Sequence, residues 1–378
     1  MNKLLCFVDK AGEPQHSFID GMLAKRCSED FDVIIYTSWD KLSDIGTKSY
    51  HNSMLRTYLF PRRGFYRLLN VILVALICFY SAFRNYNFSV VAFCRNEPSF
   101  LLGAQLVSFI RNLDCVFQSS FPHEDVGGGM KSAIAKLIFN LCGKYVKKIT
   151  AVSDEGLKRM KRYFPEASGI VVPLMGDEVV ALPIRRNGQQ VKFVYIGTLD
   201  SSREFEVVVK AFCKVMQEEK YDVSLDIYGG NEAQWKDLVS KVSNYNFTMP
   251  SSRISYNGCM KREDLFSTIE KYDVGISLVP KNNITSEMSP TKLSEYMGCG
   301  LAVLASNTVT SQVDIMSDSQ CGCLIDFSCE DIIRGIGVFC EDSNALFGYK
   351  QRSVIFVKNT FTYDVKKEEF LDFLRSDI

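Results

Sequence analysis

The sequence carries no excess of charge. Lysine and arginine together number 44, and aspartate and glutamate also number 44 in a chain of 378 residues. Without a net charge the whole protein has no long-range attraction for nucleic acid or for acidic membranes, so any basic surface must be local. We therefore expect no nucleic-acid partner.

Several catalytic motifs are also absent. The chain has no G-x-S-x-G elbow and no Walker phosphate loop, and "VDKAGEPQH" follows the first predicted strand where a dinucleotide enzyme would have G-x-G-x-x-G. No cysteine and histidine spacing is typical of zinc. The D-x-D pair, Asp30 and Asp32, precedes a predicted strand and so lies at the wrong sheet edge for a metal-diphosphate site. These absences disfavour hydrolases, kinases and nicotinamide or flavin enzymes, and we predict no catalytic metal and no cofactor.

The thirteen cysteines do not indicate a disulfide framework. Their number is odd, the chain is long, and most lie in apolar runs such as "LICFY" and "VAFCR". We expect reduced thiols in a hydrophobic core. The opening "MNKLLCFVDKAGE" becomes polar after about eight residues, which favours a first strand over a signal peptide and predicts a cytoplasmic location.

One apolar stretch leaves two interpretations open. Within "PRRGFYRLLNVILVALICFYSAFRNYNFS" about thirteen residues are nearly continuously apolar, fewer than the ~20 that span a bilayer. Arginines at 62, 63, 67 and 84 flank this stretch, so residues 62–84 could lie against an anionic membrane surface, at the inner face of the membrane. A buried crossover helix with solvated arginines fits the same pattern.

Two series of strand-like runs alternate with helical segments. The first series is "KLLCFVD", "FDVIIYTS", "FSVVAFCR", "DCVFQSS" and "KITAVS", and the second is "VKFVYIG", "VSLDIYG", "RISYNG", "DVGISLV", "LAVLAS" and "GCLID". This order predicts an α/β protein with two Rossmann-like, doubly wound parallel-sheet domains. A polar linker with prolines near 176–190 separates residues 1–180 from residues 190–360. The amphipathic segment 361–378 is a helix that could pack back on the first domain.

The most informative segment is "EMSPTKLSEYMGCGLAVLAS", residues 287–306. Ser289 suits a helix N-cap and Pro290 the first helical position, and an apolar stripe from residue 293 should pack on a sheet. Two carboxylates, Glu287 and Glu295, then lie near a helix start, which attracts anions through its free N–H groups and dipole. Glu295 shares its side of the helix with Thr291 and Lys292. Such a site fits a nucleotide sugar, which offers a diphosphate and sugar hydroxyls.

Three other loops follow predicted strands. Arg203 lies near a helix start and could fork onto phosphate oxygens, although a surface arginine fits equally well. Gly229 and Gly230 would let backbone approach a ligand, but they equally make a tight turn. His123, in "FQSSFPHEDVGGG", would be near a ligand site if the sheet prediction holds, and is otherwise a solvated loop residue.

The ordered motifs resemble those of family 4 glycosyltransferases of the GT-B fold. The E-x7-E pattern from Glu287 to Glu295 is followed by "YMGCGLAVLAS", and "YIGTLDSSRE", "LDIYGGNE", "ISYNGCMKREDL" and "YDVGISLVP" precede it in the family's order, as do "VKKITAVSDEGLKRM" and "IVVPLMGDE". The likeness is good over about residues 145–327 and general before residue 120. It implies two Rossmann-like domains facing across a cleft, with the acceptor bound by the first domain and the nucleotide sugar by the second.

The resemblance also implies roles for single residues. Glu295 matches the glutamate that accepts hydrogen bonds from ribose hydroxyls, and Glu287 matches the one near the transferred sugar. Arg203 matches the family's lysine on the diphosphate, and His123 resembles its histidine near the donor sugar. Gly197 matches the glycine that ends the first strand of the second domain.

Two positions depart from the family pattern. Thr198 stands where an arginine commonly follows Gly197, so the diphosphate lacks one expected cation, and we expect Lys292 to replace it. The segment "PLMGDE" stands where a Pro-Asn-Gly loop is common.

The sequence thus predicts a retaining, metal-independent glycosyltransferase (a hexosyltransferase). It would move a sugar from a UDP- or GDP-linked donor to a glycan or lipid-linked acceptor in polysaccharide or glycolipid biosynthesis. The nucleotide-sugar site would comprise Glu287, Thr291, Lys292, Glu295, Arg203, His123, Gly197, Gly229 and Gly230. Two alternatives stay open: a catalytically silent nucleotide-sugar-binding protein and a nucleotide-sugar epimerase of the same fold.

Overall fold

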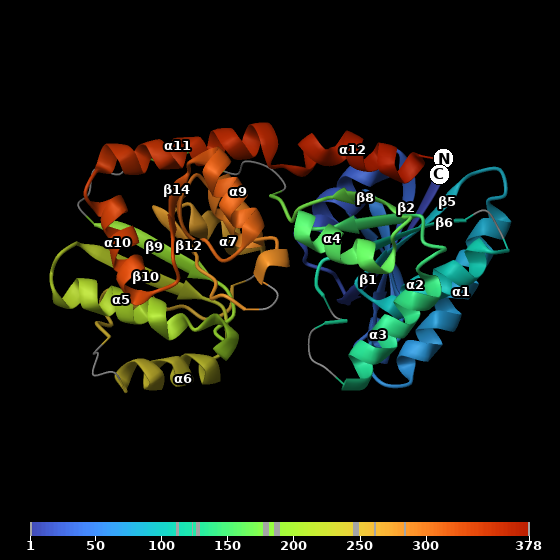
Figure 1. Cartoon of the computed structure of the whole chain (residues 1–378), viewed down its shortest axis with the longest axis horizontal. Helices are drawn as coiled ribbons and strands as arrows, with labels where there is room; N and C mark the ends of the chain where they lie inside the picture. Colours follow the sequence, from blue (N-terminus) through green and yellow to red (C-terminus); the bar gives the residue numbers. More distant parts are fainter. Residues whose placement is uncertain are drawn as a thin grey trace. The chain divides into compact units, whose positions relative to one another are not determined.

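A computed structural model describes residues 2–110, 113–122, 124–125, 129–176, 181–184, 190–244, 249–260, 262–282 and 285–376. The chain divides into two compact units, one formed by Met1–Asp177 with Tyr363–Ile378 and the other by Glu178–Thr362. Each unit contains one sheet with helices packed on it (Figure 1). The polar linker expected near residues 176–190 falls at this division.

The first unit is built on an eight-stranded sheet in the order β3-β4-β2-β1-β5-β6-β7-β8. Its strands are β1 (Asn2–Ala11), β2 (Phe31–Ser38), β3 (Gly46–Tyr50), β4 (Ser53–Leu59), β5 (Val90–Arg95), β6 (Leu113–Ser119), β7 (Lys148–Ala151) and β8 (Ser168–Val171). All neighbours pair in parallel except β3 and β4, which form an antiparallel edge. The predicted parallel sheet is therefore confirmed, and β3, β4 and β8 are additions to it.

Helices cover this sheet on both faces. They are η1 (Phe18–Arg26), α1 (Tyr66–Arg84), α2 (Pro98–Ser108), α3 (Gly129–Cys142), α4 (Asp154–Tyr163) and α12 (Tyr363–Arg375), with short turns η2 (Cys27–Glu29) and η3 (Leu42–Asp44). Inner residues of α1, α2 and α3 share one core with alternate residues of β1, β5 and β6. On α12, Phe370 contacts the rings of Phe18 and Phe93 edge-on, with centroids 5.9 and 6.0 Å apart. The C-terminal helix therefore belongs to the core of the first unit.

A buried lysine also holds α12 to this unit. Lys148 of β7 is 2% exposed and donates hydrogen bonds to the carbonyl oxygens of Leu374 and Ser376 at the end of the helix. A cation at a helix C-terminus is favourable because the last carbonyls lack helical partners and carry the negative end of the dipole.

The thirteen cysteines are all unpaired, and nine of them are buried. Burial raises the pKa of several of these thiols, including Cys6 and Cys78. The expectation of reduced core thiols is confirmed for those nine, whereas Cys259 is exposed.

The second unit has a six-stranded parallel sheet in the order β11-β10-β9-β12-β13-β14. Its strands are β9 (Val191–Ile196), β10 (Val223–Tyr228), β11 (Ile254–Tyr256), β12 (Val274–Ser277), β13 (Ala302–Ser306) and β14 (Gly322–Ile325). Its helices are η4 (Ser201–Arg203), α5 (Phe205–Gln217), α6 (Glu232–Ser243), α7 (Arg262–Ile269), η5 (Thr285–Glu287), α8 (Thr291–Gly298), α9 (Thr310–Ser319), α10 (Cys329–Cys340) and α11 (Ser343–Thr360). The strand order reverses between β9 and β12, as in doubly wound nucleotide-binding sheets, whose ligands bind at this switch point.

At the switch point, one tyrosine provides the hydrogen-bond partner that β9 lacks. β9 and β12 pair only at Phe193 with Val274 and Val194 with Gly275, and the strands diverge beyond these residues. There the N–H of Ile196 donates to the hydroxyl of Tyr296 on α8, 2.9 Å away. Tyr296 is fully buried, and burial raises the pKa of its hydroxyl, so the group stays neutral. A side chain of α8 thus replaces a strand as the partner of β9.

Glycine at position 275 permits this arrangement. A Cβ atom there would lie 2.2 Å from Cγ of Tyr296, closer than any real contact. The tyrosine ring therefore lies directly on the backbone of β12, and α8 is brought close to both strands.

The hydrogen bond between Tyr296 and Ile196 can be tested by Tyr296→Phe. This change should lower the free energy of unfolding by about 1–3 kcal/mol, because the buried N–H of Ile196 loses its acceptor. Urea unfolding of the full chain measures the effect. Tyr349→Phe is the matched control: its ring packs on Arg352, its hydroxyl bonds to no described residue, and a change within about 0.5 kcal/mol is expected. Equal effects of the two substitutions would contradict the role given to Tyr296.

Candidate functional site

The helix α8 begins one residue later than the sequence predicted. Pro290, with φ −80° and ψ 85°, is the N-cap, and Thr291 is the first helical residue. The prediction of Ser289 as N-cap and Pro290 as the first helical residue is therefore wrong. The reason is local: Pro290 has a non-helical ψ, and the N–H of Thr291 donates to the carbonyl oxygen of Ser289 at 3.0 Å. The N-cap Pro290 makes no side-chain cap hydrogen bond, and the N–H groups of Thr291 and Leu293 donate to the carbonyl oxygens of Ser289 and Pro290 at 3.0 and 3.1 Å, so attraction of an anion here rests on the helix dipole and the remaining amides.

The predicted apolar stripe of α8 is confirmed. Leu293, Tyr296 and Met297 are all fully buried against the sheet of the second unit. This anchoring fixes which side of the helix carries Glu295.

Glu295 and Lys292 form an ion pair on α8. Nζ of Lys292 lies 2.5 Å from Oε2 of Glu295, and the two residues are one helical turn apart. The glutamate side chain is 2% exposed, whereas that of the lysine is 37% exposed. A nearly buried carboxylate is costly unless a cation or several donors compensate it, so Lys292 stabilises the charge of Glu295. The sequence placed both residues on one side of the helix but did not predict that they pair.

Glu287 ends the short helix η5 and is partly exposed. The segment that carries it is fixed from both sides. The hydroxyl of Thr285 donates to the carbonyl oxygen of Asn282 at 2.9 Å, and Ser311 of α9 donates to the carbonyl oxygen of Met288 at 2.7 Å. Glu287 is therefore presented from an anchored loop between β12 and α8.

The loop after β9 is similarly ordered. The hydroxyl of Tyr195 donates to the carbonyl oxygen of Thr198 at 2.8 Å, and burial raises the pKa of this tyrosine to about 12. Arg203 ends η4 and is partly exposed, and its Nε lies 3.4 Å from Oγ1 of Thr198. Asp200 caps η4 by accepting from the N–H of Ser202 at 3.1 Å. The guanidinium of Arg203 is thus directed along the loop that ends the central strand.

The glycines after β9 and β10 have a clear structural role. Gly229 has φ +102° and Gly230 has φ +66°, values that other residues adopt only with strain. A Cβ at Gly229 would lie 2.2 Å from the carbonyl oxygen of Gly197. Gly229 also donates its N–H to the carbonyl oxygen of Gly258 at 2.7 Å. These residues bring the carboxyl ends of three neighbouring strands close together.

The structure therefore gathers most of the predicted residues at one edge of the second sheet. The loops after β9 and β10 carry Gly197, Arg203, Gly229 and Gly230. The segment that follows β12 carries the remaining residues, with Glu287 in η5 and Thr291, Lys292 and Glu295 in the first two turns of α8. His123 lies outside the described residues.

A polar cluster in the first unit was not predicted from the sequence. At the carboxyl ends of β1 and β5, Asp9 forms an ion pair with Arg95 and accepts a hydrogen bond from Nδ2 of Asn96 at 2.9 Å. Arg95 and Asn96 also reach Oγ of Ser120, at 3.0 and 2.7 Å. Burial alone would raise the pKa of Asp9, but Arg95 and Asn96 hold it below its ordinary value. Asn96 has φ +59°, a strained conformation that often marks a functional site.

One sequence signal could have located this cluster. In "CFVD", "AFCRN" and "FQSS" a polar residue follows directly after a buried run, which places it at the edge where parallel sheets bind ligands.

No group of three or more histidine, cysteine, aspartate or glutamate side chains suited to a metal occurs among the described residues. The D-x-D pair instead forms ion pairs near the start of β2, Asp30 with Arg375 at 2.7 Å and Asp32 with Lys3 at 3.1 Å. The prediction that this pair lies at the wrong sheet edge is confirmed.

Comparisons with known proteins agree with this geometry. Residues 183–353 match the family described as "Glycosyl transferases group 1". Among curated protein sequences none matches this chain.

Three solved structures share the fold over the whole chain. Sucrose-phosphate synthase from Thermosynechococcus elongatus is 12% identical with a TM-score of 0.75, covering 99% of this chain and 98% of that one. A glycosyltransferase from Rickettsia africae is 15% identical with a TM-score of 0.69, covering 100% and 99%. HepE from Anabaena, solved in complex with UDP, is 13% identical with a TM-score of 0.65, covering 99% of each chain. Residues 183–353 therefore resemble the group 1 glycosyl transferases, and the chain as a whole shares the two-domain GT-B fold of these solved structures.

Proposed function

We propose that this chain is a retaining, metal-independent glycosyltransferase that moves a hexose from a UDP- or GDP-linked donor to a glycan or lipid-linked acceptor. The observation that carries the proposal is the buried Glu295 beside Lys292 on α8, at the switch point of the sheet that matches the group 1 family. A carboxylate held there can accept two hydrogen bonds from a ribose diol. HepE, which shares the fold, has been solved with UDP and with UDP-glucose.

The diphosphate would be bound by the uncapped start of α8 together with Arg203 and Lys292. An ammonium group has three donors, so Lys292 can keep its bond to Glu295 and still approach a phosphate oxygen. Thr291 would contribute as the first residue of α8. The close packing of Gly197, Gly229 and Gly230 would let the nucleotide lie against backbone.

The chemistry follows from where charge develops. As the bond between the sugar's anomeric carbon and the diphosphate oxygen breaks, negative charge grows on the leaving nucleoside diphosphate. Fixed cations and backbone N–H groups stabilise that charge in the transition state. Glu287 would orient the transferred sugar, and His123 is proposed on the family resemblance to lie near it. An acceptor hydroxyl then bonds to the anomeric carbon on the face that the phosphate leaves, and the proton of that hydroxyl passes to an oxygen of the departing diphosphate.

The setting we propose is polysaccharide or glycolipid biosynthesis in the cytoplasm, at the inner face of the membrane. Residues 62–84 support a peripheral contact. The helix α1 has 19 residues and is long and apolar enough to cross a membrane by length and composition, which corrects the shorter apolar length expected from the sequence, but core helices also pass this test. Its inner face, including Val74 and Cys78, is fully buried in the core, whereas its outer face is exposed. The buried inner face agrees with a crossover helix packed on the sheet, and the exposed outer face supports the membrane contact that we propose.

The proposed reaction predicts release of nucleoside diphosphate only when an acceptor is present. A panel of UDP- and GDP-hexoses, tested with glycan and lipid-linked acceptors, should yield a product whose anomeric configuration, read by NMR, equals that of the donor. Excess EDTA should leave the rate unchanged. Inversion, or loss of activity with EDTA, would overturn that part of the proposal. Binding without turnover would indicate a silent binding protein, and a changed sugar without acceptor would indicate an epimerase.

If Glu295 binds the ribose diol, replacing it should weaken the binding of nucleotides that carry this diol. Glu295→Gln, which keeps the shape of the side chain, and Glu295→Ala should weaken nucleoside diphosphate binding by about 1.5–3 kcal/mol, the range for hydrogen bonds to charged groups. Calorimetry with the 2′,3′-dideoxy nucleotide is the control, because a ligand without the diol should bind wild type and variants alike. An equal loss for both nucleotides would assign Glu295 a structural role through Lys292.

The diphosphate role of the two cations predicts an effect on turnover. Arg203→Ala and Lys292→Ala should each reduce kcat by about 10²–10³, since each removes one group that stabilises the developing charge. The double variant should be less than additive, because groups that act on one anion are not independent. Arg203→Lys and Lys292→Arg are the matched controls, which keep the charge and should retain most of the rate. Near-normal kcat in Lys292→Ala would show that the lysine serves only to hold Glu295.

A further inference from the structure

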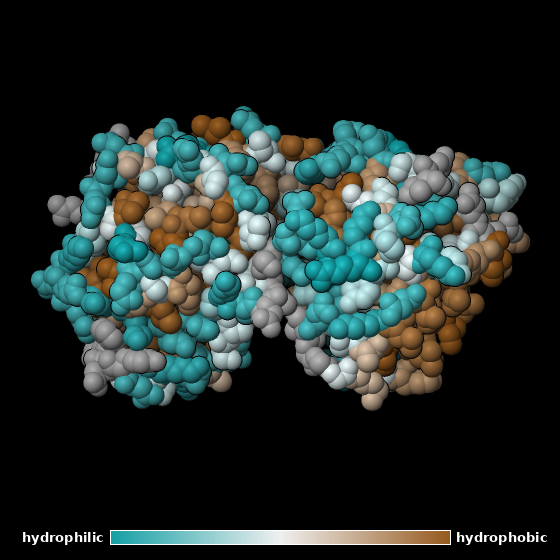
Figure 2. Space-filling model, in the orientation of Figure 1, coloured by the Kyte–Doolittle hydropathy of each residue, from teal (hydrophilic) through white to brown (hydrophobic). Residues whose placement is uncertain are grey.

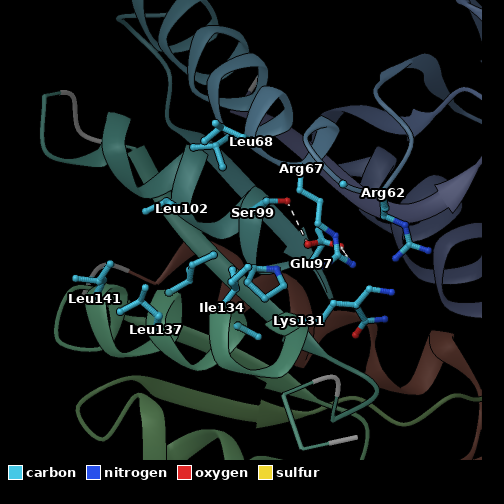
Figure 3. A pocket seen from close by; sticks show the side chains of 16 residues that line it. Arg62, Arg67, Leu68, Glu97, Ser99, Leu102, Lys131, Ile134, Leu137 and Leu141 are labelled. Carbon is cyan, nitrogen blue, oxygen red and sulfur yellow. Dashed lines mark hydrogen bonds and ion pairs between the residues drawn. The ribbon is translucent and has the colours of Figure 1, made fainter. Parts of the chain in front are cut away.

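Two cavities lie beside α1 in the first unit. The larger, of about 760 Å³, is lined by residues of α1, α2 and α3 and by Asn96, so it continues the polar cluster described above (Figure 3). The smaller has a volume of about 340 Å³, within the range of roughly 300–1,000 Å³ that is usual for ligand sites. We call it the strand-helix cavity, because it lies between the second half of α1 and the strands β1, β2 and β4. Its charged and aromatic lining consists of Lys3, Tyr36, Arg56, Tyr58, Tyr80 and Arg84.

The strand-helix cavity is separate from the exposed apolar surface of the first unit. Figure 2 shows apolar side chains gathered over the helices of this unit. On α1, Leu68, Ile72 and Phe79 are exposed but do not line the cavity. Helical spacing places the lining residues of α1 along one side of its second half, namely Leu76, Ile77, Tyr80, Ser81 and Arg84. A ligand of this cavity therefore meets the side of α1 that is turned toward the strands.

Strand pairing fixes Arg56 against Tyr36. The two residues lie opposite each other on the parallel strands β4 and β2, so their side chains leave the same face of the sheet. Nη1 of Arg56 donates to the hydroxyl of Tyr36 at 3.2 Å, and the guanidinium carbon lies 5.9 Å from the centroid of the tyrosine ring. Tyr36 is 2% exposed, and burial raises the pKa of its hydroxyl. The phenol therefore stays neutral and does not compensate the charge of the arginine.

Arg56 has an unused pair of donors. No carboxylate forms an ion pair with it among the described residues, and its Nε is buried without a hydrogen-bond partner there. Because Nη1 donates to Tyr36, Nε and Nη2 remain, and these two atoms form one edge of the guanidinium group. Such an edge matches the two oxygens of a carboxylate, which it binds with two parallel hydrogen bonds. Since a half-buried cation without a counter-ion is unfavourable, an anionic ligand would stabilise this site.

A second guanidinium lies at the end of α1. Nη1 of Arg84 donates to the hydroxyl of Tyr80 at 2.9 Å. Arg84 also has a structural role, because a cation in the last turn of a helix interacts favourably with the helix dipole. In the same turn the carbonyl oxygen of Ser81 accepts hydrogen bonds from the N–H and Nδ2 of Asn85 at 3.1 and 2.7 Å. That oxygen is therefore already satisfied, and Arg84 keeps most of its donors for a ligand.

The charges around the cavity leave a positive surplus. Lys3 is the third cation of the lining, and its Nζ lies 3.1 Å from Oδ2 of Asp32 on the neighbouring strand. The side chain of Asp32 is 44% exposed and does not line the cavity. Three cations therefore stand against one carboxylate, and none of the lining residues is acidic. This balance favours an anion over a neutral or cationic ligand.

The remaining lining residues indicate the body of the ligand. Tyr58 of β4 and Tyr80 of α1 bring one ring from the strand side and one from the helix side, 38% and 60% exposed. The hydroxyl of Tyr58 is hydrogen-bonded to that of Thr47 on β3 at 2.8 Å, which fixes the orientation of its ring. Ile34 and Ile77 add apolar surface. Tyrosine rings favour flat aromatic partners, on which they stack or pack edge-on.

We propose that the strand-helix cavity binds a small soluble aromatic carboxylate of one or two fused rings. Nε and Nη2 of Arg56 hold the two carboxylate oxygens, Arg84 and Lys3 add positive potential, and the ring lies between Tyr58 and Tyr80. The site does not depend on the proposed sugar transfer, and its test therefore measures binding.

The probe is 2-naphthoate, titrated into the full chain and measured by calorimetry. It should bind at least about tenfold more tightly than acetate, 2-naphthylmethanol and decanoate, because these lack the ring, the charge and the flat ring system respectively. Decanoate also tests whether the carboxylate of a fatty chain, rather than that of an aromatic acid, occupies the cavity.

Arginine variants test the paired hydrogen bonds. Arg56→Gln and Arg56→Lys should each weaken 2-naphthoate binding about tenfold or more, since neither an amide nor an ammonium group forms the two parallel bonds of a guanidinium. Arg63→Gln is the matched control. Arg63 is exposed and does not line the cavity, so its replacement removes the same charge from the unit and should change binding less than about twofold.

Tyrosine variants test the ring independently of Arg56. Tyr58→Leu should weaken 2-naphthoate binding about threefold or more, because an aromatic pair is lost. Tyr58→Phe keeps the ring and loses only the hydrogen bond to Thr47, so it should bind 2-naphthoate nearly as well as the wild type. Tyr58 is exposed, and both substitutions should leave the urea unfolding midpoint nearly unchanged.

Three results would overturn the proposal. The first is 2-naphthoate binding no tighter than any one of the three partial ligands, decanoate included. The second is an equal loss in Arg56→Gln and Arg63→Gln, which would show attraction by general charge. The third is an equal loss in Tyr58→Leu and Tyr58→Phe, which would show that the ring does not contact the ligand. Each result leaves the proposed sugar transfer untouched, since none measures turnover.

Discussion

The second unit depends on the N–H of Ile196, a strand amide that has no strand to bond to. β9 and β12 part after two paired residues, and the Tyr296 hydroxyl supplies the missing acceptor. Because that ring must lie on the backbone of Gly275, α8 has only one position relative to the sheet. The same constraint fixes the uncapped start of α8 at the switch point and directs Glu295 and Lys292 away from the apolar stripe. Tyr296 therefore fixes the position of the candidate site at the point where β9 and β12 diverge.

Much of this arrangement could be predicted because its causes are local. The buried strands are continuous apolar runs, and the stripe from Leu293 to Met297 follows helical spacing, so both are visible in the sequence. The edge strand β3 and its neighbour β4 were missed because most of β3 is exposed and polar, and β4 alternates buried with exposed residues. The N-cap was misplaced by one residue, since the ψ of Pro290 is set by the loop that leads into α8. The pairing of Lys292 with Glu295 depends on how deeply the glutamate is buried, which spacing alone does not give.

The polar cluster of the first unit shows a different limit. Asp9 and Arg95 are 86 positions apart, and Asp9 and Asn96 are 87 apart, so no local pattern joins them. Only the adjacency of β1 and β5 in the sheet makes them neighbours. Their interactions satisfy buried charge at the edge where parallel sheets bind ligands, and the strained Asn96 lies at its centre. The sequence can indicate that a polar residue follows a strand. Which residues it pairs with depends on the order of the strands in the sheet.

A chain with no net charge cannot attract a phosphate from a distance, so its candidate site must concentrate positive potential locally. In the second unit the start of α8 and Lys292, which pairs with the buried Glu295, supply that potential beside a carboxylate that would select a diol. The anion-binding groups would serve any phosphate ester, so the neighbouring carboxylate decides what the phosphate must be attached to.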